Sequence, residues 1–221
     1  PQQFPMILNA DIILDSWMIA GILGITPLTA AMGAYGIMVN DKAENKERDF
    51  ITSPMGRIKM LNGYIFSASA SAIIISLAVL ILALLYMALC YGKMPIKGQV
   101  LSTILIIIVN SICSSAMVML PVSLLKSSNA LAACCTIIGS LIGFLTGIYL
   151  PMGSLDEAVK LLIKTFPISH TVVLLRKKFT NTFIDDGMLV DVAASFREYM
   201  GIDFLLNGNV MSSYISILIV V

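Results

Sequence analysis

Charged residues divide the chain into long apolar stretches. Four stretches contain no charged residue at all: 16–40, 60–92, 98–125 and 127–155. A helix needs about 20 apolar residues, at 1.5 Å of rise each, to cross a bilayer. Each stretch is long enough, so the pattern predicts an all-α, polytopic bundle of transmembrane helices.

Glycine, proline and polar residues near the ends of these stretches set the expected limits of the helices. We expect spans at about 16–39, 63–91, 100–125 and 130–150, and the start of another at 210–221. The last run supplies about half a span.

Small and polar residues inside the spans are candidates for contacts between helices. Asn110 lies in the middle of the third span, where it either packs by a hydrogen bond or lines a pathway. Gly139, Gly143 and Gly147 recur every fourth residue, so they share one face of the fourth span. Such a stripe lets another helix approach closely, within the subunit or across a dimer.

The region 151–208 is more polar, and its pattern is amphipathic. Ser154 and Glu157 have the spacing of a capping box, and apolar residues then recur at helical spacing. We expect a short helix at the membrane interface that ends at Pro167. Arg176 is expected near the C-terminal end of the next helix, where a helix dipole favours cations.

Composition agrees with a membrane protein and excludes several other classes. Of the 221 residues, 58% are hydrophobic and 12% are charged, whereas soluble domains have about 25% charged residues. The mean hydropathy is +0.93. The net charge of +1 indicates nothing about partners, and no basic tract points to nucleic-acid binding. The four cysteines lie in or beside the spans, and with a single histidine we expect no metal, cofactor or catalytic site in this chain.

The connecting segments predict the orientation in the membrane. In the short loops, six basic residues lie on the side of segment 40–62 and two on the other side. The positive-inside rule therefore places 40–62 in the cytoplasm and the region 151–208 outside.

Segment 40–62 contains the densest cluster of charges in the chain. Acidic and basic residues alternate up to Asp49, and Phe50 and Ile51 then form an apolar tip ahead of Ser53-Pro54. Two interpretations fit this pattern: a solvated loop between two spans, or a docking helix for a cytoplasmic partner.

Three blocks of sequence resemble the ABC-2 type permeases, the membrane subunits of a class of ABC exporters. The blocks are Asp41-Lys42 to Ser53-Pro54, Ile148 to Leu155, and Phe166 to His170 with Arg176. The resemblance covers nearly the whole chain, in order. It implies that this chain lacks the first span and most of the last of a six-span subunit.

The resemblance also implies a function and a set of partners. Residues 40–62 would form the coupling loop that contacts an ATP-binding cassette subunit, which would carry ATP and Mg. Two permease copies, identical or different, would form the pathway in the plasma membrane, for efflux of a drug or a peptide. The implied contacts with the ATPase are Glu44, Glu47, Arg48, Asp49, Phe50, Ser53 and Pro54, and the implied outer hairpin carries Pro151, Gly153, Pro167, His170 and Arg176.

The sequence itself restricts where the energy could come from. It has no GxxxxGK[ST] motif, so we expect this chain not to be an enzyme and ATP hydrolysis to take place on the partner. Asn45 and Arg48 depart from the family's usual glycine and acidic residue. The alternatives are an ion-coupled secondary transporter, an intramembrane enzyme, and a sensor or scaffold without transport. The first two usually need ionisable residues within the spans, and the predicted spans have none.

Overall fold

The computed structural model describes residues 10–46, 56–92, 99–149, 151–187, 190–203, 205–206 and 209–210. The chain forms the helices α1 (Ala10–Ala34), α2 (Gly36–Ala43), α4 (Gly56–Tyr91), α5 (Val100–Ser123) and α6 (Ser128–Leu145). A short 3₁₀ helix (Met152–Ser154) then leads to α7 (Glu157–Thr165), α8 (Pro167–Gly187) and α9 (Val190–Tyr199). Two-residue strands, β1 (Leu205–Leu206) and β2 (Asn209–Val210), pair antiparallel.

The prediction of an all-α, multi-pass membrane bundle is confirmed. Four helical segments are long and apolar enough to cross a bilayer: Ala10–Ala43, Ile58–Tyr91, Val100–Ser123 and Ser128–Leu145. The bent pair of α7 and α8 gives a fifth candidate if it is counted as one broken span.

The observed limits of the first two spans differ from the predicted ones. The first helix begins at Ala10 rather than Ser16, so Asp15 lies inside it, where it accepts hydrogen bonds of 2.7 Å from the hydroxyls of Tyr86 and Tyr91 in α4. The second span begins at Gly56 rather than Gly63. The predicted loop 40–62 is therefore wrong in its extent, because its two ends belong to the flanking helices.

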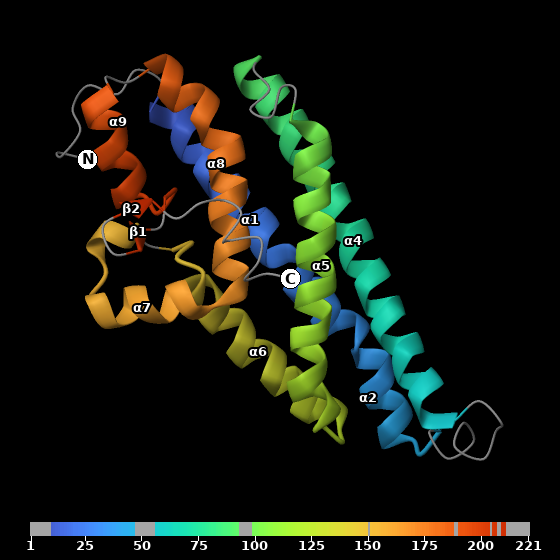
Figure 1. The fold of residues 1–221 in the computed structure, drawn as a ribbon. Coiled ribbons are helices and arrows are strands. Elements are labelled where there is room, and N and C mark those ends of the chain that lie inside the picture. The colour runs from blue at the N-terminus through green and yellow to red at the C-terminus, as the bar shows by residue number, and fades with distance from the viewer. Residues whose placement is uncertain are drawn as a thin grey trace.

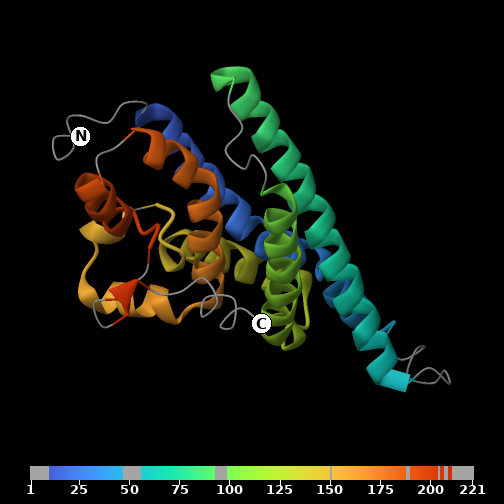
Figure 2. The same cartoon turned by 45° about the horizontal axis from the view of Figure 1, so that its top comes forward.

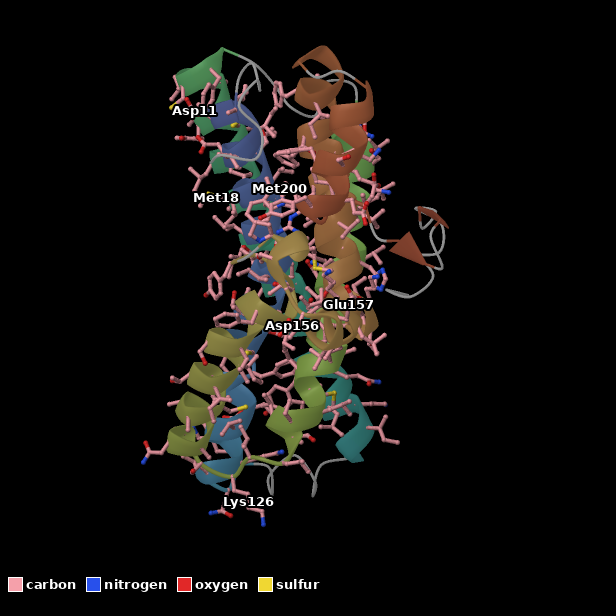
Figure 3. The ribbon with its side chains drawn as sticks, turned by 90° about the vertical axis from the view of Figure 1, so that its left-hand side faces the viewer. Asp11, Met18, Lys126, Asp156, Glu157 and Met200 are labelled. Atoms are coloured by element: carbon pink, nitrogen blue, oxygen red, sulfur yellow. The ribbon has the colours of Figure 1, made fainter. Side chains whose placement is uncertain are left out.

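The spans run lengthwise beside one another, and α4 is the longest of them (Figure 1). In both ribbon views α1 and α2 lie between α4 and the helices of the C-terminal half (Figure 2). Asp11 lies at one end of the molecule and Lys126 at the other (Figure 3). Helix α6 starts beside Lys126 and tilts away from α5.

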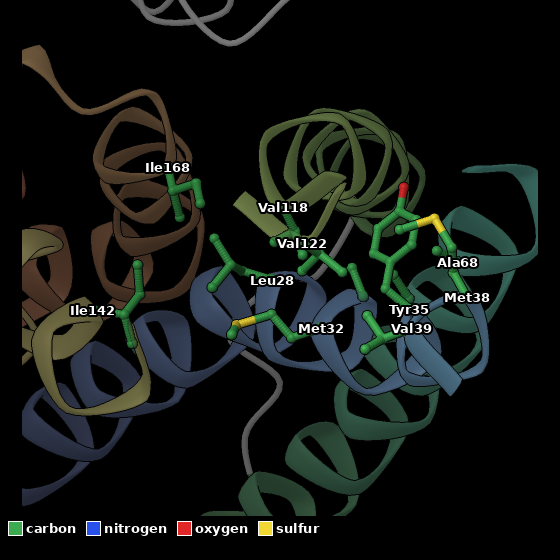
Figure 4. Packing of buried hydrophobic residues seen from close by; sticks show 12 residues of the cluster. Leu28, Met32, Tyr35, Met38, Val39, Ala68, Val118, Val122, Ile142 and Ile168 are labelled. Carbon is green, nitrogen blue, oxygen red and sulfur yellow. The ribbon is translucent and has the colours of Figure 1, made fainter. Parts of the chain in front are cut away.

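The core of the bundle is built around α1 and α2. Leu28, Met32 and Tyr35 pack against Val118 and Val122 of α5 (Figure 4). The same cluster contains Ala68 of α4, Ile142 of α6 and Ile168 of α8, so every long helix contributes to it.

Helix α5 turns its polar residues inward. Its buried positions are Thr103, Ile107, Asn110, Ser111, Ser114, Ser115, Val118 and Val122. By contrast, large apolar side chains of α4 such as Phe66, Ile74 and Leu89 are exposed on the outside. This inversion is expected in lipid, where the hydrocarbon chains solvate apolar surface and polar side chains find partners between helices.

The region predicted to lie outside packs along the side of the bundle. Helices α7 and α8 meet at an angle of 91°. Asp156 and Glu157, where α7 begins, lie at mid-height between Asp11 and Lys126 (Figure 3), and α8 runs from there alongside the first half of α1 (Figure 1). The hairpin therefore re-enters the bundle.

Two details of the predicted tail need correction. The capping box is wrong: Asp156 is the N-cap of α7, and Ser154 Oγ instead donates to the carbonyl of Pro151 at 2.7 Å. Val210, the expected start of a last span, lies in β2, and residues 211–221 are outside the described residues.

Candidate functional sites: the loop end of α2 and a buried arginine

Three consecutive residues at the end of α2 each contact a different helix. Asn40 Oδ1 accepts a 2.6 Å hydrogen bond from Ser128 Oγ at the start of α6. Asp41 Oδ2 accepts a 2.6 Å hydrogen bond from the hydroxyl of Tyr64 in α4. We call Asn40, Asp41 and Lys42, with these partners, the loop-end cluster.

The third contact of the loop-end cluster uses the end of α5. Lys42 Nζ donates to the carbonyl oxygen of Ser123, the last residue of α5, at 2.8 Å. The last carbonyls of a helix lack partners within it and carry partial negative charge, so a lysine is a favourable partner there. The end of α2 is thus joined to α4, α5 and α6 at once.

The chain leaves the loop-end cluster in a tight turn. Asn45 has a φ of +59°, in the left-handed region that favours glycine and that asparagine adopts more readily than most residues. Asn45 therefore provides the conformation that a glycine would provide at this position. Glu44 is exposed and pairs with Lys46 at 2.6 Å, and this hydrogen bond raises the pKa of Lys46.

The other residues expected to contact an ATPase are Glu47, Arg48, Asp49, Phe50, Ser53 and Pro54. They lie outside the described residues.

At the other end of the bundle, a buried arginine joins α8 to three other segments. Arg176 is 1% exposed. Its Nη2 donates to the carbonyl of Gly147 at 2.9 Å, and its Nη1 lies 3.5 Å and 3.4 Å from the carbonyl oxygens of Met200 and Gly201. The guanidinium also stacks 4.1 Å from the ring centroid of Trp17, a cation–π distance. We call this group of residues the Arg176 node.

Trp17 completes the Arg176 node from the side of α1. Its indole Nε1 donates to the carbonyl of Met200 at 2.8 Å. Among the described residues, the ion pairs do not include Arg176. The buried cation is thus held by carbonyl dipoles and an aromatic ring rather than by a carboxylate.

The carbonyls come from two helix ends with the same geometry. Gly147 and Gly201 both have a φ of +65° and follow α6 and α9. At each end the residue after the glycine closes a six-to-one hydrogen bond, Ile148 to Gly143 and Ile202 to Arg197, both 2.9 Å. These are Schellman motifs, which turn the chain at a helix C-terminus.

The expected place of Arg176 in its helix was wrong. Helix α8 continues to Gly187, so Arg176 lies in its middle and not at its end. The helix C-termini whose partial negative charge the guanidinium meets belong to α6 and α9, which lie far from it in sequence.

The other residues of the predicted outer hairpin also have structural partners. Pro167 is the first residue of α8, a position that needs no backbone donor. His170 Nε2 lies 2.8 Å from the carbonyl of Lys164 and so fastens α8 to the end of α7. Gly153 leaves room for the ring of Tyr199, because a Cβ there would lie 2.1 Å from it. Pro151 precedes the 3₁₀ helix.

The residues proposed for a pathway or for packing do not form one group. Asn110 is buried, and its Nδ2 donates to the carbonyl of Gly24 in α1 at 2.9 Å, a contact of the helix-packing kind. No described atom approaches the Cβ position of Gly139, whereas a Cβ at Gly143 would lie 2.2 Å from the ring of Tyr149. Gly147 lies beyond the helix, so the three glycines do not form one close seam.

Side chains of other segments also approach two glycines of α1 closely. A Cβ at Gly24 would lie 2.3 Å from Val172 Cγ2, and one at Gly21 would lie 2.9 Å from Ile148 Cγ1. Glycines in α1 therefore admit side chains of α8 and of the segment after α6.

An apolar cavity of about 210 Å³ lies between α5 and α6. Its lining is made only of apolar residues: Leu28, Met117, Val118, Pro121, Ile138, Leu141, Ile142, Leu145 and Phe166. Within the described residues, no group of three histidine, cysteine, aspartate or glutamate side chains is placed to hold a metal ion.

Comparisons with protein-family models, with curated proteins and with solved structures give no match to this chain.

Sequence reasoning missed the partners in both sites. Trp17, Asn40 and Tyr64 were read as parts of spans or loops. Each could have been noticed as a polar or amphipathic side chain near the end of an apolar run, where such residues often contact neighbouring helices. Their partners lie far away in sequence, and no local spacing indicates them.

Proposed function

We propose that this chain is a membrane permease subunit of an ATP-driven exporter, coupled to a separate ATP-binding subunit. The observation that carries the proposal is the loop-end cluster, in which Asn40, Asp41 and Lys42 each hold a different helix. A push on the adjoining loop would reach α4, α5 and α6 together. A coupling element needs this property, because a local contact change must be passed to a bistable bundle.

The distribution of charge supports the same proposal. Charged residues are concentrated in and beside the loop that follows α2, and the sequence between Lys59 and Lys93 has no charged residue. A cytoplasmic ATPase, with ATP and Mg bound to it, would supply the energy. A second permease copy would complete the pathway in the plasma membrane.

Asp15 does not favour ion coupling as the function. It is an acidic residue within α1, but it lies near the outer end. Its carboxylate already accepts hydrogen bonds from two tyrosine hydroxyls. An ion-coupled carrier usually places its titrating groups near the middle of the membrane.

The test is purification of the intact protein from its native membrane, followed by identification of proteins that remain bound. We expect an ATP-binding subunit to co-purify. Reversal of charge at Glu47 and Arg48 should abolish substrate-stimulated ATP hydrolysis. As a control, Lys160→Glu changes a charge in α7, far from the loop, and should leave hydrolysis unchanged. Full transport by the purified protein without any ATPase would contradict the proposal.

A further inference from the structure

The outer hairpin holds together through contacts of its own. Lys177 in α8 pairs with Asp203, just after α9, at 2.7 Å, and both side chains are mostly buried. The ring of Tyr199 in α9 lies over Gly153 before α7. Helices α7, α8 and α9 thus have internal ties that do not involve α1.

Within the described part of the chain, the Arg176 node makes a polar connection between this hairpin and the first span. Trp17 is the α1 residue of the node, and it both stacks on the guanidinium and donates to the carbonyl of Met200. The surrounding contacts between α1 and the hairpin are apolar, as in the cluster of Ile12, Ile13, Phe183 and Ile184. The node adds hydrogen bonds and a stacking contact of defined direction to this apolar packing.

We infer that Arg176 is the positioning residue of the outer hairpin, a latch that keeps α8 and α9 against α1. The inference uses the bundle alone and does not depend on the proposed ATPase partner.

The chain contains its own reporter of this latch. Its sequence has a single tryptophan, Trp17, which is 6% exposed in the closed node. Its quenching by acrylamide therefore reports on whether the hairpin covers α1, whereas its fluorescence maximum also responds to the cation stacked on the ring. The measurement uses the full chain in lipid nanodiscs, with no ATPase present.

We expect Arg176→Met to shift the Trp17 emission to longer wavelength and to increase quenching. Arg176→Lys should give an intermediate value, because lysine keeps a cation beside the indole but cannot serve three carbonyls with a planar fork. Lys177→Met is the matched control: it removes the neighbouring cation and an ion pair within the hairpin, and should leave Trp17 emission unchanged.

A second pair of variants leaves the arginine in place. A Cβ at Gly201 would lie 2.4 Å from Met152 Cγ and 3.4 Å from Arg176 Nη1, so Gly201→Ala should also increase quenching of Trp17. Gly92 has nearly the same φ, +61°, and no described atom within 4 Å of its Cβ position. Gly92→Ala therefore carries the same backbone strain without touching the latch, and its emission should match that of the unaltered chain.

Two results would overturn the inference. One is unchanged emission and quenching in both Arg176→Met and Gly201→Ala. The other is an equal shift in Lys177→Met, which would mean that any loss of charge in α8 loosens the hairpin. If Arg176→Met does not fold, the comparison of Gly201→Ala with Gly92→Ala decides the question alone.

Discussion

The two ends of the bundle use polar contacts in different ways. At the loop end, three neighbouring side chains make three separate hydrogen bonds to three helices, and all three side chains are partly or fully exposed. At the outer end, one fully buried guanidinium gathers three carbonyls and an indole. The first arrangement distributes its contacts, and the second concentrates them.

The difference concerns the free energy that is lost when each set of contacts is broken. Each contact of the loop-end cluster can be exchanged for water at small cost, because its members lie near solvent. The Arg176 node has no such alternative while the hairpin is closed, since its polar groups are buried. We therefore expect substitutions at the Arg176 node to lower the free energy of unfolding more than substitutions in the loop-end cluster, even where the same number of contacts is lost.

The largest effect is expected at the Arg176 node. Arg176→Met should lower the free energy of unfolding by about 2–4 kcal/mol, because buried carbonyls lose their donors. The measurement is equilibrium unfolding in mixed micelles with increasing SDS. A loss no larger than that of Lys178→Met, a matched change two residues along the same helix, would contradict the view that the node concentrates the contacts.

The next largest effect tests the end of α6 that lies nearest to the outer hairpin. Gly143→Ala should lower the free energy of unfolding by about 1–2 kcal/mol, because its Cβ would lie 2.2 Å from the ring of Tyr149. Gly139→Ala, one turn earlier on the same face, has free space and should stabilise the helix by about 0.5–1 kcal/mol. Equal effects at both glycines would mean that this end of α6 is not packed as described.

The helices could largely be predicted from the sequence, whereas the contacts between them could not. The spans follow from runs without charge, since local composition decides what enters lipid. The bend at Pro167 follows from a residue type with a strong local preference, whereas the turn after Ala43 was not predicted. The contacts of Trp17 with Arg176, and of Asp41 with Tyr64, depend on how helices pack, which no local spacing specifies. The amphipathic pattern of 151–208 likewise gave a helix at α7 but not the return of α8 into the bundle.

A smaller effect is expected at the loop-end cluster. Tyr64→Phe removes the hydroxyl that donates a hydrogen bond to Asp41. It should lower the free energy of unfolding by about 0.5–1.5 kcal/mol. Tyr149→Phe removes a hydroxyl from an exposed ring and serves as the control, with no change expected. The same SDS titration measures both variants. A loss at Tyr64 as large as at Arg176 would remove the difference between the two ends.

The smallest effect is expected where two donors share one acceptor. Tyr86 and Tyr91 both donate to Asp15 Oδ2 at 2.7 Å, so Tyr86→Phe leaves the carboxylate with a partner. We expect a change below about 0.5 kcal/mol, whereas the double variant with Tyr91→Phe should lose clearly more than the sum of the single changes. Simple additivity would show that the two hydroxyls act independently.

The central claim is that the loop-end cluster passes force from the loop to the spans, and ATP hydrolysis tests it most directly. The variant combines Asn40→Ala, Asp41→Asn and Lys42→Met, and it is compared with the unaltered chain in nanodiscs with the co-purified ATP-binding subunit. The account predicts that the ATPase stays bound but that substrate no longer stimulates hydrolysis, while Gly139→Ala keeps full stimulation. Undiminished stimulation in the triple variant, with the ATPase bound, would contradict the account.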